Sequence, residues 1–152
     1  MEPLRRTIDL DVTPYQPEDF YELDFSDLDA PIVAIGDKLG LEHSEIAYTA
    51  RVAEGILFCA GVTELWPGVG QGWVLPSRLV KKYPKLFHHR LKRVLLPIFR
   101  SKGFHRVQTT CAVDATRIQW LERIGFEREG LMRGYGPGKE DMLMFAWLRK
   151  DK

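Results

Sequence analysis

The sequence predicts an α/β (α+β) domain in which helices flank a mixed central sheet. Short apolar runs typical of strands alternate with helical patterns along the chain. The 152 residues fit one domain, so residues 1–152 are assigned to a single unit. A content of 45% hydrophobic and 28% charged residues is ordinary for a globular protein.

The predicted elements follow the order β-α-α-β-β-β-α-β-α-β-β. In chain order they are a strand at 4–12, a helix within 14–23, a helix at 32–39, strands at 45–53, 55–65 and 72–76, a long helix within 77–103, a strand at 105–112, a short helix before Gly125, and strands from 126 and at 142–148. The glycines at 70 and 72, which follow Trp66-Pro67-Gly68, are predicted to mark a turn.

Helix limits are predicted from residues that start or stop helices. Pro17 is tolerated in a first turn, and the two acids after it suit the positive helix end. In the long helix, apolar residues between 86 and 99 keep helical spacing, while lysines and arginines fill the other face. Pro84 opens this helix or its second turn, and Gly103 ends it.

The last third of the chain is predicted to form a short helix and a β-hairpin. Ile118, Leu121 and Ile124 recur at helical spacing, which gives the helix one apolar face. Gly125 suits the left-handed position after a helix, where a Cβ is penalised. The bend of the hairpin contains Gly134, Gly136, Pro137 and Gly138.

This segment resembles the C-terminal half of the GCN5-related N-acetyltransferase (GNAT) superfamily. That family reads Asn-x-x-Ala-x-x-x-Tyr-x-x-x-Gly-Phe and then Glu-Gly-x-x-Arg. The residues that match are Gly125, Phe126, Glu129, Gly130 and Arg133. Asp114 stands in the place of the Asn and Leu121 in that of the Tyr. The resemblance implies a GNAT-like sheet that splays between strands 72–76 and 105–112; the alternative is an ordinary α/β hairpin domain without acyl transfer.

A second pattern is similar to acetyltransferase-like proteins of tailed bacteriophages, including internal virion proteins. It combines Trp73-Val74-Leu75, Tyr83-Pro84, a helix rich in arginine and lysine, and the run IQWLERIGF at 118–126. This resemblance implies a bacteriophage protein, and it leaves the chemistry of the group open.

The GNAT resemblance implies acetyl-coenzyme A (acetyl-CoA) as cosubstrate and an amine acceptor, either a small molecule or a protein. In that family the pantetheine arm pairs with the strand before the long helix, and the diphosphate lies at the helix N-terminus, where free N–H groups and the dipole favour anions. The cofactor-binding residues implied in this way are Trp73, Val74, Leu75, Arg78, Lys81, Lys82, Asp114 and Arg117. For Asp114, capping of the following helix is the favoured and compatible interpretation.

The loop before the long helix departs from the family. GNAT enzymes carry Arg/Gln-x-x-Gly-x-Gly/Ala there, whereas residues 75–87 contain no glycine. Arg78, Lys81 and Lys82 can neutralise phosphate, or they can form a solvated basic helix face.

Acetyl transfer requires an amine that loses a proton and a thiolate that gains one. Leu121 cannot supply that proton, and Thr109 or Thr110 stands where related enzymes place a Glu. Glu64 is therefore the candidate base, acting through water; the alternative is a solvent-facing carboxylate at a strand end. Tyr135 is the candidate acid or substrate-binding residue; the alternative is a packed hairpin aromatic.

Composition narrows the remaining classes of function. A net charge of +1 argues against a general nucleic-acid binder. Cys59 and Cys111 lie in apolar runs and are expected to be buried free thiols of a reducing compartment; the alternative is a disulfide. The sequence has no ligand spacing that predicts a metal site and no apolar run that predicts a membrane span.

Two functions are consistent with these residues. The first is an acyl-CoA-dependent N-acyltransferase in the cytoplasm. The second is a catalytically inert GNAT-like structural or interaction module. A homodimer or a component of a phage particle, and with it a virion location, is compatible with either function.

Overall fold

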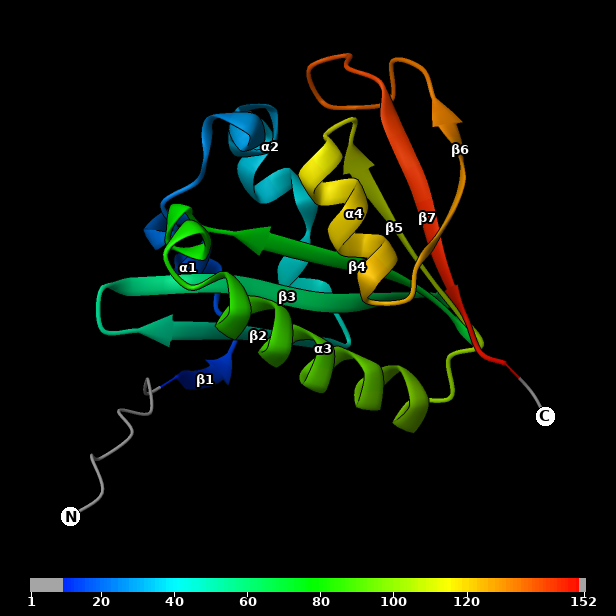
Figure 1. The fold of residues 1–152 in the computed structure, drawn as a ribbon, viewed down its shortest axis with the longest axis horizontal. Coiled ribbons are helices and arrows are strands. Elements are labelled where there is room, and N and C mark those ends of the chain that lie inside the picture. The colour runs from blue at the N-terminus through cyan, green and yellow to red at the C-terminus, as the bar shows by residue number, and fades with distance from the viewer. Residues whose placement is uncertain (1–9, 151–152) are drawn as a thin grey trace.

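The computed structural model describes residues 10–150. Its elements are β1 (Asp11–Pro14), α1 (Pro17–Glu22), α2 (Ala30–Ile35), β2 (Ile46–Val52), β3 (Gly55–Trp66), β4 (Val69–Pro76), α3 (Pro84–Ser101), β5 (Arg106–Ala112), α4 (Ala115–Arg123), β6 (Glu127–Met132) and β7 (Met142–Leu148) (Figure 1). Short 3₁₀ helices lie at Asp27–Asp29, Gly36–Leu39, Leu41–His43 and Arg78–Lys81. The predicted order of strands and helices is confirmed.

The strands of the described region form one sheet in the order β1-β2-β3-β4-β5-β7-β6. Neighbouring strands are antiparallel except β4 and β5, which are parallel. The β4–β5 ladder starts at Val69 and Arg106 and stops at Gln71 and Gln108. Beyond these residues the two strands diverge, as Figure 1 shows. The predicted splay of the sheet is therefore present.

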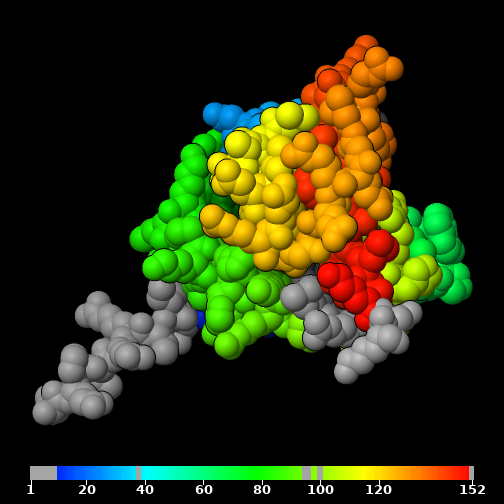
Figure 2. All heavy atoms as spheres, turned by 45° about the vertical axis from the view of Figure 1, so that its right-hand side comes forward, coloured from blue at the N-terminus to red at the C-terminus, as the bar shows by residue number. Residues whose placement is uncertain are grey.

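The helices cover the two faces of the sheet unequally. Helices α3 and α4 lie on the face toward the viewer in Figure 1, and α1 and α2 lie on the far face. The larger buried cluster includes Phe87 and Leu91 of α3 and Leu121 of α4. The smaller cluster packs Phe20 of α1 against Leu75 of β4 and other buried residues. Helices α3 and α4 lie side by side in the space-filling view (Figure 2), and Phe87 stacks on Trp120 at 5.1 Å.

Some predicted boundaries differ from those observed. The strand predicted at 72–76 begins at Val69, because Gly70 lies in the strand and not in a turn. A Cβ at Gly70 would lie 2.9 Å from the Phe104 ring, so the missing side chain allows close packing. The second helix ends at Ile35, since Gly36 has a φ of +46° and the chain continues as a 3₁₀ helix. Residues 4–9 of the predicted first strand lie outside the described residues.

Candidate active site

The diverging ends of β4 and β5 enclose a small cavity of about 20 Å³, here called the cleft cavity. Gly72, Trp73 and Val74 line it from β4, Thr109 lines it from β5, and Trp120 is among the residues that line it from α4. A volume of this size holds roughly one water molecule. Side chains therefore fill most of the space between the two strands in this conformation, and a longer ligand must displace some of them.

Trp120, which lines the cleft cavity, has an unmet hydrogen-bond donor. Its Nε1 is buried and has no hydrogen-bond partner among the described residues. Leaving a buried donor unpaired costs about 1–3 kcal/mol, so an acceptor group placed there would be stabilised. In the sequence, Trp120 stands out only as part of the run at 118–126. The signal was available, since Trp120 directly precedes Leu121, which replaces the family Tyr.

The junction between β4 and α3 has most of its backbone amides paired. Ser77 N–H donates to the Leu57 carbonyl at 3.0 Å, and Arg78 N–H donates to the Asp24 carbonyl at 2.9 Å. Ser77 Oγ accepts from Leu79 N–H at 3.2 Å. Phe25 also forms a β-bridge to Ser77, so the chain after α1 runs across the end of β4. These amides cannot cradle a phosphate unless this pairing is broken.

The start of α3 has backbone N–H groups that are available to an anion. Among the described residues, the amides of Lys85 and Leu86 have no backbone partner. They belong to the first turn, where N–H groups point out of the helix and the dipole is positive. Pro84, the first residue of α3, has no N–H to add.

The cations predicted to bind phosphate lie at this junction, and two of them are paired. Arg78 donates to Asp27 at 3.0 Å and lies 3.5 Å from Asp24. Lys82 donates to Glu54 at 2.7 Å, and this hydrogen bond raises the pKa of the lysine. Lys81 is exposed. An anion at α3 would therefore compete with carboxylates for Arg78 and Lys82.

Asp114 and Arg117 fix the start of α4. Asp114 Oδ2 accepts from Arg117 N–H at 3.1 Å, which confirms the predicted cap. The Arg117 guanidinium donates both terminal nitrogens to the two oxygens of Asp29, at 2.7 and 2.9 Å. Asp29 is 4% exposed and lies at the end of the 3₁₀ helix before α2. This ion pair, unforeseen from the sequence, joins α4 to the segment before α2 on the other face of the sheet.

The three predicted residues of β4 divide between the faces of the sheet. Trp73 Nε1 donates to Ser44 Oγ at 2.9 Å, and its ring packs edge-on against Tyr15 at 5.4 Å. Leu75 is buried in the smaller cluster with α1, whereas Val74 packs against the larger cluster. At the closed end of the splay, a Gln108 side chain from β5 donates to Gln71 of β4 at 3.1 Å.

The predicted acid and base lie apart from the cleft cavity. Glu64 is exposed and stands opposite Gly70, at the end where β4 and β5 are paired. Tyr135 is 58% exposed in the bend between β6 and β7. The same bend holds Glu140, whose buried Oε2 has no partner among the described residues. No sequence signal marked Glu140, because its burial depends on how the bend folds.

Residues 10–150 contain no candidate membrane-spanning helix and no candidate metal site. Within this range, no helix is both long enough and apolar enough to span a bilayer. The same residues contain no cluster of three or more His, Cys, Asp or Glu side chains placed to hold a metal ion.

Comparisons with known proteins identify the fold. No family model and no curated protein sequence matches the chain. Ard1 from Thermoplasma volcanium matches with a TM-score of 0.68 at 10% identity, covering 93% of this chain and 99% of its own. A Bacillus subtilis acetyltransferase in complex with CoA matches with a TM-score of 0.68 at 10% identity, covering 95% and 100%.

A GNAT-family acetyltransferase from Bacillus anthracis matches with a TM-score of 0.65 at 17% identity, covering 93% of this chain and 96% of its own. These structures span nearly the whole of both chains. The protein therefore has the mixed α/β fold of the GNAT acetyltransferases.

Proposed function

We propose that the protein is an acyl-CoA-dependent N-acyltransferase that moves an acetyl group from acetyl-CoA to an amine. The observation that carries this proposal is the early end of the β4–β5 ladder at Gln71 and Gln108. Parallel neighbours in one sheet ordinarily pair along their length. Here the strands part toward the N-termini of α3 and α4, so an extended ligand that displaces the side chains between them can lie along β4.

The residues present fit the pantetheine arm better than the diphosphate. Beyond Gln71, β4 does not pair with β5, and Trp120 adds an unmet donor beside it. The amide groups of the pantetheine arm can form hydrogen bonds with the unpaired backbone of β4 and with the Trp120 donor. The diphosphate would rely on the free amides of Lys85 and Leu86 and on nearby cations, including Lys81.

The reaction balances without a metal or a redox partner. The neutral amine attacks the thioester carbonyl carbon, the carbon–sulfur bond breaks, and the thiolate takes up a proton. Glu64, acting through water, is proposed to accept the proton of the amine. Tyr135 is proposed to bind the acceptor or to donate to the thiolate. General acid–base assistance of this kind is worth about 10²–10⁴-fold in rate.

Calorimetric titration of acetyl-CoA, followed by an assay of thiol release with a panel of amines, tests the proposal. We expect binding, a raised melting temperature and release of thiol. Glu64→Gln should lower the rate most near neutral pH, and Tyr135→Phe should lower it if that hydroxyl serves as the acid. Glu127→Gln, an exposed strand carboxylate, is the matched control. If neither change alters the rate, the two assignments fail.

A second candidate function, a catalytically inert structural or interaction module, is favoured by one observation. The amides of Ser77, Arg78 and Leu79 are already bonded, so the junction lacks the open cradle of the family. In that case the phage resemblance would point to a role as a component of a particle. No heat of binding and no shift in melting temperature with acetyl-CoA would favour this module over the enzyme.

A further inference from the structure

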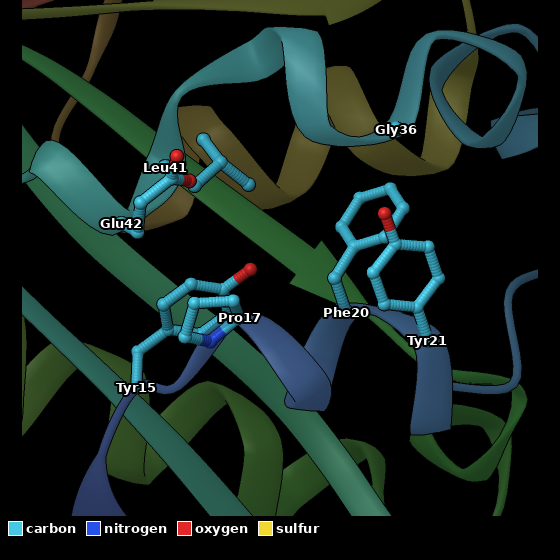
Figure 3. Close-up of a pocket in the computed structure, with 7 residues that line it drawn as sticks. All are labelled: Tyr15, Pro17, Phe20, Tyr21, Gly36, Leu41 and Glu42. Carbon is cyan, nitrogen blue, oxygen red and sulfur yellow. The ribbon is translucent and has the colours of Figure 1, made fainter.

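A pocket of about 90 Å³ lies between α1 and the 3₁₀ helices that follow α2 (Figure 3). Three aromatic side chains, Tyr15, Phe20 and Tyr21, line it together with Leu41 and Glu42. Figure 3 shows Tyr15 approaching from the chain before α1, Phe20 and Tyr21 from α1, and the other two from the facing segment. This set is called the aromatic pocket below, and none of the roles assigned above involves it.

The aromatic pocket combines ring surfaces with a carboxylate. The Phe20 and Tyr21 rings meet edge to face, with centroids 5.5 Å apart. Glu42 is paired only weakly, with the exposed side chain of His43 at 3.4 Å. No cationic side chain is among the described residues that line the pocket. Aromatic faces beside a weakly paired carboxylate are the surroundings that favour an organic cation.

Tyr15 adds a neutral dipole to this pocket. Burial, followed by neighbouring negative groups that include Glu42 and Asp19, raises the pKa of Tyr15 to about 12. The hydroxyl therefore keeps its proton at neutral pH and does not neutralise a bound cation itself. Asp19 is already paired with Arg51 at 2.7 Å, so Glu42 is the group that would stabilise a positive charge entering the pocket.

The distribution of charge along the chain points to the same ligand. Residues 17–45, which include every residue of the pocket wall except Tyr15, contain nine carboxylates and one lysine. Residues 65–113 contain ten lysines and arginines and no carboxylate. The segment before and after α2 is thus acidic, and the β4–α3–β5 segment is basic. Five of these nine carboxylates are paired with Arg51, Arg78 or Arg117, so the described acids without such a partner, Glu42 among them, supply the attraction for a cation on the α1–α2 side.

We propose that the aromatic pocket binds an ammonium group of the acceptor that does not react, so that the acceptor is an aliphatic diamine. This inference rests on the proposed N-acyltransferase function. The reacting amine must be neutral to attack a thioester, whereas aromatic faces and a carboxylate favour a protonated amine. The two requirements are met together when the acceptor carries a second amine.

Two packed rings separate the pocket from the cleft cavity. Tyr15 lines the pocket, its ring packs against Trp73 at 5.4 Å, and Trp73 lines the cleft cavity. The Trp73 indole Nε1 donates a hydrogen bond to Ser44 Oγ at 2.9 Å, which fixes the position of the ring. A Cβ at Gly61 would lie 2.7 Å from the Trp73 ring, so this glycine lets the ring lie close to β3. A carbon chain that joins the held ammonium to the reacting amine would have to displace one of these packed rings.

Calorimetry with 1,4-diaminobutane tests the binding step, with 1,4-butanediol as the uncharged analogue. We expect the diamine alone to bind. Glu42→Gln should raise its Kd about fivefold, the equivalent of one partly exposed ion pair. Tyr21→Leu, at a side chain that is 71% exposed, should raise it about two- to fivefold through loss of a cation–π contact. Glu45→Gln removes an exposed carboxylate of the same segment outside the pocket and should have less than a twofold effect.

Thiol release from acetyl-CoA tests the consequence for catalysis. We expect kcat/KM for 1,4-diaminobutane to exceed that for 4-amino-1-butanol at least tenfold, and Glu42→Gln to reduce this ratio. Equal effects of Glu42→Gln and Glu45→Gln on binding would overturn the inference, because only the general field would then matter.

The two proposals can fail separately. Equal kcat/KM values for the diamine and the amino alcohol would overturn the diamine inference and leave the acyltransferase proposal intact. Diamine binding that depends on Glu42, without thiol release from any amine, would support the ammonium site and contradict the acyltransferase proposal.

Discussion

The two junctions that follow the central strands β4 and β5 are built in opposite ways. After β4, the amides of Ser77 and Leu79 are bonded within the protein, and the side chains there form exposed ion pairs. After β5, Arg117 forms a bidentate ion pair with the buried carboxylate of Asp29. One turn further along α4, Trp120 keeps a buried N–H group without a partner among the described residues.

This difference indicates where a ligand gains most from binding. Exposed ion pairs contribute about 0–1 kcal/mol to stability, so those at the β4–α3 junction stabilise it little. Replacing a carboxylate partner by a phosphate there would add little binding free energy. An unmet buried donor carries a cost of about 1–3 kcal/mol that a ligand can relieve. We therefore expect acetyl-CoA to be held mainly along its pantetheine arm, beside α4.

The largest expected effect follows from breaking the β5–α4 junction. Arg117→Met should lower the free energy of unfolding by about 3 kcal/mol, because it leaves the buried Asp29 carboxylate without its cation. Arg78→Met at the β4–α3 junction is the matched control and should cost less than about 1 kcal/mol, since its partners Asp24 and Asp27 are exposed.

Urea denaturation of both variants measures this contrast. The double change Asp29→Asn with Arg117→Met should recover part of the loss, since no buried charge remains unpaired. Equal losses in the free energy of unfolding for Arg117→Met and Arg78→Met would show that the two ion pairs contribute equally to stability.

A smaller effect is expected at Trp120. Trp120→Phe removes the unmet donor and keeps an aromatic ring against Phe87. The affinity for acetyl-CoA should fall about tenfold, the equivalent of one hydrogen bond of about 1.4 kcal/mol. The stability of the free protein should change by less than about 1 kcal/mol, because removal of the unmet donor offsets the lost contacts.

Calorimetry and urea denaturation separate these two quantities. Trp66→Phe, at an exposed tryptophan at the end of β3, should change neither. A Trp120→Phe variant that loses stability but binds acetyl-CoA normally would assign Trp120 to packing alone.

The sequence predicted those parts of the fold that depend on neighbours along the chain. Pro84 and Gly125 mark helix limits locally, and the motif around Gly125 and Phe126 placed the chain in a splayed sheet. The pairing of Asp29 with Arg117 escaped prediction, because it joins residues 88 positions apart and leaves no local pattern.

The candidate site was less predictable for the same reason. Whether Trp120 Nε1 finds a partner depends on every side chain around it, and the aromatic pocket forms only when Tyr15 meets the chain near Leu41. The cations of the β4–α3 junction were visible in the sequence. Their carboxylate partners, such as Glu54 beside Lys82, were not, because β-strand pairing brings them together.

The smallest expected effect concerns the phosphates of the cosubstrate. If the pantetheine arm supplies most of the affinity, Arg78→Ala with Lys82→Ala should weaken acetyl-CoA binding by only about 1 kcal/mol, because each cation must leave a carboxylate to reach a phosphate. Arg90→Ala with Lys92→Ala removes the same charge from exposed positions further along α3 and serves as control. Calorimetry with acetyl-CoA and with S-acetyl-pantetheine, which lacks the phosphates, should give Kd values within about tenfold. A loss of three or more orders of magnitude with S-acetyl-pantetheine would place the binding energy at the β4–α3 junction and reverse the comparison. In that case Ser77 and Arg78 must exchange their present backbone partners for phosphate oxygens when acetyl-CoA binds.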